Sequence, residues 1–228
     1  MRNDKDQGAP SMLLRRFWVI GAGRFGQIAV KRVLRHFPQA HITVVDREPL
    51  VPAGDCVTMV RAEGVEWLVN ALQEEGRAVD MVVPAIPSHV AYEWMVQHLK
   101  RQFTILPLEP DDRLLSRIPH PIRGSAGRIY VSHADFICPD SCAEPENICT
   151  HTGKPRPRDL FRLLADLDTV KVQPVVLRSF QLLPGVGGLY PHHLQRALDS
   201  VIAHQRQPLM IATACRCHGV LDLIRLHD

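Results

Sequence analysis

The sequence between residues 17 and 46 contains a strand, a glycine-rich turn, an amphipathic helix and a second strand in that order. Residues 17–20 form a continuous apolar run, and apolar side chains then recur at helical spacing over residues 25–37. Pro38 ends this pattern, because the residue before a proline avoids helical dihedral angles. Residues 41–45 are largely β-branched and indicate a further buried strand. This succession predicts two parallel strands joined by a crossover helix, so the expected fold class is α/β.

Three glycines occupy the turn between the first strand and the helix. The turn consists of Gly21, Ala22, Gly23, Arg24, Phe25 and Gly26. In such a turn the first glycine permits the sharp change of direction, the second lets a pyrophosphate approach the backbone, and the third lets the helix pack closely on the strand. The N–H groups at the helix start and the positive end of the helix dipole favour phosphate. The pattern therefore predicts a dinucleotide site.

Asp46 ends the second strand, 20 residues after Gly26. An acidic residue at this place accepts hydrogen bonds from the adenosine ribose hydroxyls and repels a 2′-phosphate, which favours NAD over NADP. Arg47 follows directly and weakens that preference, because a guanidinium group binds a 2′-phosphate well. We therefore expect NAD as the cofactor and leave NADP open.

These residues resemble the NAD(P)-binding Rossmann superfamily, over roughly residues 13–110. Residues 63–99 (EGVEWLVNALQEEGRAVDMVVPAIPSHVAYEWMVQHL) are similar to the saccharopine-dehydrogenase-like branch and to the nucleotide-binding regulatory domains of potassium channels and uptake systems. In both, a helix leads into a D-x-V-V strand and then a small or proline-containing turn. The resemblance implies a Rossmann fold and a nicotinamide dinucleotide. It does not extend into the rest of the chain and implies no substrate.

The alternation of strand and helix continues beyond the first unit. Strands are expected at residues 57–60, 79–83, 103–108 and 129–132, and helices at residues 65–72 and 88–99. We therefore expect a doubly wound, mainly parallel Rossmann sheet over residues 12–132, preceded by a disordered tail at residues 1–11. Residues 133–228 predict a smaller cysteine-rich α+β region. Its expected elements are a helix at residues 157–167, a strand at 175–183, a helix at 191–203 and a final strand at 209–214.

The carboxyl edge of an open α/β sheet is where such sheets bind ligands. Pro84 follows the expected strand at residues 79–83, and Ser88 lies shortly after it, so we assign both to the nicotinamide side of the cofactor. His89 is a candidate general acid or base, because an unperturbed imidazole titrates near neutral pH. The alternative is that Ser88 caps the next helix and that His89 is a solvated residue in its first turn.

Five of the six cysteines lie in the C-terminal region. These five are Cys138, Cys142, Cys149, Cys215 and Cys217. Because the cytosol keeps thiols reduced, we expect them to bind a metal rather than to form disulfides. The spacing lacks the C-x-x-C knuckles of structural zinc sites, so an iron–sulfur cluster is slightly favoured over zinc. A redox-active thiol pair and unconnected reduced thiols are the alternatives.

Three histidines are further candidate ligands for such a centre: His133, His151 and His218. The sixth cysteine, Cys56, stands apart from the others in the sequence. We expect it to be a small buried residue without a role in the centre.

Composition and charge exclude several classes of protein. No apolar run is long enough to span a bilayer, and the polar start of the chain lacks the apolar core of a secretory signal, so we expect a cytoplasmic protein. The net charge is only +3 and is spread along the chain, which argues against nucleic acid as a main partner.

Two functional hypotheses follow. The first is an NAD(P)-dependent oxidoreductase with a cysteine-ligated metal centre, acting on an unknown small-molecule substrate or electron acceptor. The second is a non-catalytic NAD(H)-binding redox sensor or regulatory protein, because no Tyr-x-x-x-Lys pair or other catalytic pair can be assigned. A homodimer is also considered, although the sequence does not determine the oligomeric state.

Overall fold

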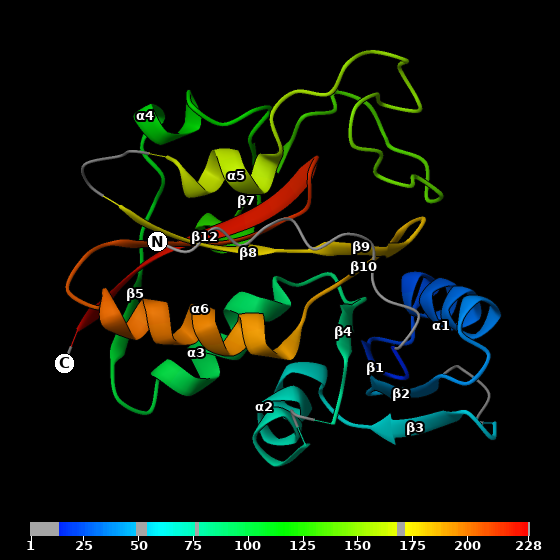
Figure 1. Cartoon of the computed structure of the whole chain (residues 1–228). Helices are drawn as coiled ribbons and strands as arrows, with labels where there is room; N and C mark the ends of the chain where they lie inside the picture. Colours follow the sequence, from blue (N-terminus) through cyan, green and yellow to red (C-terminus); the bar gives the residue numbers. More distant parts are fainter. Residues whose placement is uncertain (1–13, 49–53, 76–77, 168–171, 228) are drawn as a thin grey trace.

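A computed structural model describes residues 14–48, 54–75, 78–167 and 172–227. The predicted disordered tail at residues 1–11 lies outside these ranges. The described chain forms two main sheets with helices between them and on their outer faces, as Figure 1 shows. None of the helices in these ranges is long and apolar enough to cross a membrane.

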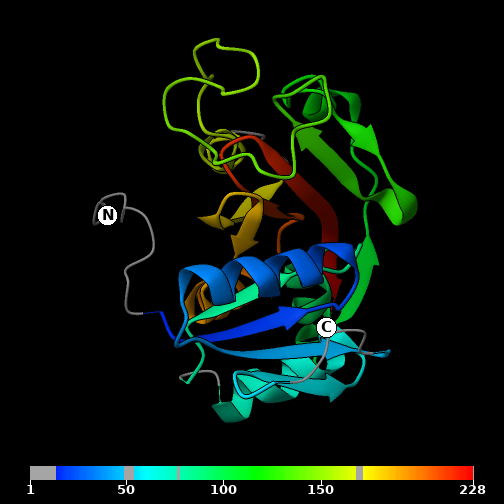
Figure 2. The same ribbon diagram turned by 90° about the vertical axis from the view of Figure 1, so that its right-hand side faces the viewer.

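The first sheet has four parallel strands in the order β3-β2-β1-β4. Its strands are β1 (Arg16–Ile20), β2 (His41–Asp46), β3 (Val57–Arg61) and β4 (Met81–Pro84), and its helices are α1 (Arg24–His36), α2 (Gly64–Glu75) and α3 (Val90–Leu99). The central strands are apolar almost throughout because helices cover both faces. α1 packs on one face, and α2 and α3 pack on the other (Figure 2). The predicted Rossmann-like parallel core is confirmed for these strands.

The second sheet has six strands and is mixed. The order is β6-β7-β12-β11-β8, and β5 also pairs with β12. Its strands are β5 (Thr104–Pro107), β6 (Ile122–Arg123), β7 (Ile129–Ser132), β8 (Gln173–Arg178), β11 (Leu209–Ala214) and β12 (His218–His227). The accompanying helices are α4 (Asp112–Leu115), α5 (Leu160–Ala165), α6 (Pro191–Ala203) and the short 3₁₀ helix η1 (Ser125–Gly127). β8 and β11 are parallel, whereas β12 is antiparallel to its neighbours.

Several predicted elements exist but belong elsewhere in the fold. The expected strands at residues 103–108 and 129–132 are β5 and β7, and both pair with β12 rather than extending the first sheet. The first sheet therefore ends with β4, not near residue 132. The expected strand at residues 175–183 is two strands, β8 and β9 (Phe180–Leu183), and the helix expected from residue 157 begins at Leu160. A local apolar pattern identifies a strand without identifying its partner.

β12 is a strand that the sequence analysis does not predict. It has 10 residues and lies in the middle of the second sheet, between β7 and β11. Asp222 interrupts its apolar residues, which obscures the strand pattern. This carboxylate is nevertheless only 5% exposed, so the fold must supply partners for it.

The two sheets share one hydrophobic core. Helices α3 and α6 lie between the sheets, and α2 packs against α3 on the first sheet. Apolar side chains of all three helices share a core with residues of both sheets, such as Val82 of β4 and Ile211 of β11. A second core lies beneath α1, and a third lies beneath α4 and α5 on the outer face of the second sheet. Because the shared core draws residues from both sheets, neither sheet buries its apolar surface alone.

A hairpin of β9 and β10 (Val186–Gly188) runs back from the second sheet to the first. Val82 of β4 and Leu189 exchange two backbone hydrogen bonds, of 2.9 and 2.7 Å. Gly188 permits this approach, since a Cβ there would lie 2.5 Å from the sulfur of Met81. The hairpin also packs into the core beneath α1.

Candidate functional site

The glycine-rich turn has a geometry that explains each glycine. Gly21 has a φ of +113°, which side chains rarely adopt, and a Cβ there would lie 2.7 Å from the carbonyl oxygen of Ala85. A Cβ on Gly26 would lie 2.0 Å from the carbonyl oxygen of Gly21, so α1 packs against the turn only because a side chain is absent. A Cβ on Gly23 would meet no described atom within 4 Å. The protein's own packing requires Gly21 and Gly26, whereas Gly23 faces open space.

The start of α1 lies directly behind this open position. Gly23 is its N-cap residue, no side chain caps the helix, and its first turn holds no acidic residue. The first N–H groups of a helix have no partner within the helix, and the positive end of the dipole lies beside them. In the described part of the chain, the first N–H groups of α1 therefore face the turn as hydrogen-bond donors for an anion. Phe25, in the same turn, is 55% exposed.

Asp46 lies at the end of β2 and holds the turn in place. One carboxylate oxygen accepts the N–H of Ala22 at 2.6 Å, and the other accepts the N–H of Glu48 at 3.0 Å. Burial opposes ionisation of Asp46, but these N–H groups and the charge of Arg47 outweigh it and lower the pKa. The carboxylate is therefore ionised and lies beside the predicted site. It also holds the glycine-rich turn in place, a role that the sequence does not reveal.

Two arginines flank Asp46. Arg47 is exposed, with its guanidinium 4.0 Å from the carboxylate of Glu63. Arg61 pairs with Asp46 in the β2–β3 register and donates to the carbonyl oxygen of Arg47 at 3.1 Å. The surroundings of Asp46 thus contain groups that suit either a ribose or a 2′-phosphate.

Pro84 ends β4 as expected, but Ser88 and His89 differ from the sequence analysis. The Ser88 hydroxyl donates to Glu93 at 3.1 Å, and the N-cap position of α3 belongs to His89, whose side chain makes no cap hydrogen bond. The alternative of a capping Ser88 and a solvated His89 is therefore wrong. His89 is 2% exposed.

The buried ring of His89 joins the first sheet to the second. Its Nδ1 lies 2.6 Å from the Asp222 carboxylate of β12, and its Nε2 lies 2.9 Å from the Thr213 hydroxyl of β11. Burial lowers the pKa of His89, although Asp222 opposes this effect. A neutral ring fits both contacts, with Nδ1–H donating to the carboxylate and Nε2 accepting from the hydroxyl.

Arg128 completes this buried network. Its Nε donates to both oxygens of Asp222 at 3.1 and 3.0 Å, and its Nη2 donates to Glu93 at 3.0 Å. Asp222 is therefore compensated by a permanent cation, which allows His89 to remain neutral. The sequence analysis identifies neither Arg128 nor Asp222. The signal that could have identified the network is the carboxylate of Asp222 within an apolar run.

The cysteines of residues 138–149 lie beside the turn between β11 and β12. Burial raises the pKa of Cys138, and the nearby thiols of Cys142 and Cys149 raise it further. Burial also raises the pKa of Cys217 to about 11, where Arg156 opposes and Cys138 and Cys142 contribute to the increase. Four of the five predicted ligands thus lie within electrostatic reach of one another.

Three thiols accept hydrogen bonds from local turns. The sulfur of Cys215 accepts the N–H groups two and three residues later, at 3.4 and 3.3 Å, and that of Cys142 accepts the N–H two residues later at 3.4 Å. The Thr152 hydroxyl and neighbouring backbone N–H groups lower the pKa of Cys149. By contrast, burial raises the pKa of Cys215 to about 12. Hydrogen bonds to sulfur favour the thiolate, which is the form that binds metals.

The thiols do not form a ligand shell. Within the described ranges, no group of three or more His, Cys, Asp or Glu side chains is arranged to hold a metal ion. Of the candidate histidines, His133 contacts the carbonyl oxygen of Arg158 at 2.9 Å, and His151 stacks on Phe136. Cys56 is partly rather than fully buried. A metal would require the cysteines to lie closer together than they do here.

The cysteine-bearing segment is attached to α1. The Asp140 carboxylate pairs with Arg24 of the glycine-rich turn, and its carbonyl oxygen accepts a hydrogen bond from Arg32 at 2.8 Å. The hairpin contributes as well, since the N–H of Gly185 donates to the carbonyl oxygen of Cys142 at 3.0 Å. The predicted nucleotide turn and the cysteines are therefore neighbours, although more than 100 residues separate them in the sequence.

Comparison with known proteins places residues 91–227 in a described family. These residues match the model "AF_1314_C: Uncharacterized protein, C-terminal domain". An uncharacterized protein of Archaeoglobus fulgidus is 28% identical over 230 residues, covering 91% of this chain and 98% of that protein. A short-chain dehydrogenase of Leptospira borgpetersenii with bound NAD⁺ aligns over 51% of this chain and 44% of its own, at 12% identity and a TM-score of 0.28.

Proposed function

This chain belongs to the AF_1314_C family, and we propose that it is an NAD(P)-dependent oxidoreductase. The observation that carries the proposal is the uncapped start of α1 behind the open Gly23. A pyrophosphate at that position would accept hydrogen bonds from the first-turn N–H groups and lie at the positive end of the dipole. The requirement for Gly21 and Gly26 supports the proposal, because both maintain this close approach of turn and helix.

A dinucleotide bound there would extend along the carboxyl edge of the first sheet in two directions. Towards β2, Asp46 retains unused lone pairs on both carboxylate oxygens and would accept the adenosine ribose hydroxyls. Its ionised state disfavours a 2′-phosphate, so we propose NAD in preference to NADP. Towards β4, Pro84 and Ser88 border the nicotinamide side.

We assign His89 a positioning role in this reaction. Both of its ring nitrogens already have partners, and its side chain is 1% exposed. The ring instead fixes the turn after β4, in which Ala85 contacts Gly21, against the second sheet. A substrate base is therefore not assigned to His89.

The nucleotide site is tested by titrating the protein with NADH and following the nicotinamide fluorescence. Gly23→Val should weaken binding at least about tenfold, or ~1.4 kcal/mol, because its side chain fills the space of the pyrophosphate. Gly54→Val is the matched control, since a Cβ on Gly54 also meets no described atom within 4 Å. Equal affinity of wild type and Gly23→Val, or no NADH binding by the wild type, contradicts the proposal.

We further propose that Cys138, Cys142, Cys149, Cys215 and Cys217 supply the ligands of a metal centre, with iron–sulfur favoured over zinc. The donor chemistry fits, because four of these thiols lie within electrostatic reach of one another and three of the five accept hydrogen bonds at sulfur. Their present arrangement does not form a ligand shell, so we assign no step of the reaction to the metal. A bound cluster would supply electron transfer, and zinc would supply structural support or Lewis acidity.

Metal analysis of anaerobically purified protein tests this second proposal. We expect stoichiometric iron with sulfide and visible charge-transfer absorption, and a Cys142→Ser variant with lower metal content. Cys56→Ser is the control and should keep the metal of the wild type. Stoichiometric zinc without iron contradicts the cluster, and protein without either metal contradicts the centre altogether.

Turnover distinguishes an enzyme from a sensor. NADH should be oxidised when an artificial electron acceptor is added, and Gly23→Val should lose this activity in parallel with binding. Tight NADH binding without oxidation by any acceptor would favour the non-catalytic sensor.

A further inference from the structure

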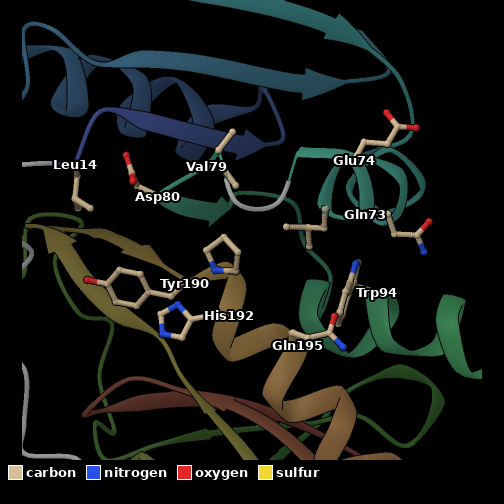
Figure 3. Close-up of a pocket in the computed structure, with 12 residues that line it drawn as sticks. Leu14, Gln73, Glu74, Val79, Asp80, Trp94, Tyr190, His192 and Gln195 are labelled. Atoms are coloured by element: carbon tan, nitrogen blue, oxygen red, sulfur yellow. The ribbon is translucent and has the colours of Figure 1, made fainter.

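A cavity of about 1050 Å³ lies at the amino-terminal edge of the first sheet. The residues just before β1 and β4, the end of α2, the middle of α3 and the start of α6 border it, as Figure 3 shows. This is the edge opposite the glycine-rich turn, which follows the carboxyl end of β1. This volume lies at the upper limit of sites for small organic ligands, which span roughly 300–1,000 Å³.

Trp94 of α3 lines this cavity with an unsatisfied donor. The residue is 2% exposed, and its indole N–H is buried without a hydrogen-bond partner among the described residues. His98 packs against the indole with ring centroids 4.5 Å apart, which fixes its orientation. A buried donor without an acceptor costs about 1–3 kcal/mol. The indole therefore favours an occupant that brings an acceptor.

Figure 3 shows Trp94 between the side chains of Gln73 and Gln195, with its nitrogen on the side of the ring nearer Gln73. Both glutamines are exposed and belong to different helices, α2 and α6. Exposed side chains of this kind change rotamer within picoseconds to nanoseconds, so the glutamines do not form a rigid wall beside the indole.

Two carboxylates and one imidazole are the groups among the described lining residues that titrate below or near neutral pH. Glu74 and Asp80 are the carboxylates, His192 carries the imidazole, and none of these residues is lysine or arginine. Asp80 accepts the backbone N–H groups of Arg15 and Arg16 at 2.8 and 2.9 Å through a single oxygen, so its second oxygen has further capacity. Carboxylates of this kind attract an ammonium group.

The remaining walls are largely apolar. Leu14, Leu72, Val79 and Tyr190 contribute them, from four separate parts of the chain. A ligand that complements the carboxylates, the indole N–H and the apolar walls therefore carries an ammonium group, a hydrogen-bond acceptor and an apolar part.

We propose that this cavity binds a small zwitterion with an apolar side chain, of the class of leucine and related amino acids. The ammonium group lies at Glu74, which follows Gln73 at the end of α2, and the carboxylate accepts the indole N–H of Trp94. The site is separate from the nucleotide site, so this inference does not depend on the proposed oxidoreductase activity.

Isothermal titration calorimetry on the full chain with three ligands of similar shape tests the contributions of the ammonium group and the carboxylate separately. L-Leucine carries both charged groups, isoamylamine carries only the ammonium group, and isocaproate carries only the carboxylate. Leucine should bind best, and each single-charge analogue should bind at least about tenfold more weakly. A parallel NADH titration reports on the nucleotide site independently.

Two variants assign the contacts. Trp94→Phe keeps an aromatic wall but removes the donor, so it should weaken leucine binding about tenfold while leaving isoamylamine unchanged. Glu74→Gln, at an exposed position, should weaken leucine and isoamylamine but not isocaproate. Trp67→Phe is the control, because Trp67 packs on Trp18 and does not line the cavity.

The proposal is wrong if leucine gives no binding heat at millimolar concentration. It is also wrong if folded Trp94→Phe binds leucine as tightly as Trp67→Phe does. Should Trp94→Phe fail to fold, Glu74→Gln decides, because unchanged leucine affinity in that variant overturns the assignment of the ammonium group.

Discussion

Among single residues, His89 illustrates how burial changes the role of a titratable group. A histidine after a strand end resembles a catalytic residue in sequence, yet its ring lies between Asp222 and Thr213 in the core. Arg128 already compensates Asp222, so a proton on His89 would add a buried charge that lacks a carboxylate of its own. The residue therefore stabilises the fold in its neutral form.

Stability should decrease as the pH falls below about 6.5. Burial lowers the pKa of His89 from 6.5 in the folded chain, against the opposing effect of Asp222. Below 6.5 the unfolded chain binds a proton that the folded chain does not, so unfolding becomes more favourable, whereas above 6.5 this contribution is constant. One histidine contributes at most about 1.4 kcal/mol per pH unit. Urea unfolding between about pH 7.5 and 5.5 measures the effect.

His89→Gln identifies the residue responsible, because glutamine retains hydrogen bonding and does not titrate. This variant should lose less stability between the two pH values than the wild type, although it is less stable at pH near neutrality. His36→Gln, at an exposed position on α1, should keep the wild-type pH dependence. An unchanged pH dependence in His89→Gln would exclude this explanation.

Among the elements, α1 connects the two candidate sites. Its start borders the glycine-rich turn. Its Arg32 donates a hydrogen bond to the backbone carbonyl of Asp140, which lies between Cys138 and Cys142 in the sequence. The side chain of Asp140 pairs with Arg24, an exposed pair that is weak in water. A bound phosphate would compete with Asp140 for Arg24.

Asp140→Asn should therefore strengthen NADH binding. The change removes a carboxylate that occupies Arg24 and repels phosphate, while the backbone contacts of Asp140 to Arg32 remain. We expect a dissociation constant about three- to tenfold lower at low salt, with a smaller effect at high salt. Asp135→Asn is the matched control in the same segment. Weaker or unchanged binding by Asp140→Asn, measured by NADH fluorescence, would show that Arg24 does not contact the phosphates.

In the whole molecule, the two sheets depend on the same helices for burial. α2 and α3 follow strands of the first sheet, whereas α6 leads from the β9–β10 hairpin into β11 of the second, and all three contribute to one core. The β9–β10 hairpin adds a second connection at the edge of β4. Removing either sheet would expose a large apolar surface on the other.

Unfolding should accordingly be a single cooperative transition. Tryptophan fluorescence reports mainly on the first sheet and the shared core, through Trp18, Trp67 and Trp94, whereas far-ultraviolet circular dichroism reports on the whole chain. The two urea transitions should coincide within error. A fluorescence transition at lower urea concentration than the dichroism transition would mean that the first sheet unfolds on its own.

The sequence alone determined those features that depend on neighbouring residues. The apolar periodicity predicted β1, α1 and β2, and the spacing of Gly21 and Gly26 reflects contacts within one turn. The glycine pattern also predicts Gly23 as the position of close approach, and a Cβ at Gly23 would meet no described atom within 4 Å.

The tertiary structure decided the features that depend on residues far apart in the chain. It assigned β5 and β7 to the second sheet, buried His89 against Asp222, and brought Asp140 to Arg24. No local pattern contains this information, because pairing between residues far apart in the chain is selected by the burial of complete faces and by the compensation of buried charge. The physical reason is that hydrophobic burial and charge pairing act between surfaces, whereas the sequence displays only neighbours along the chain.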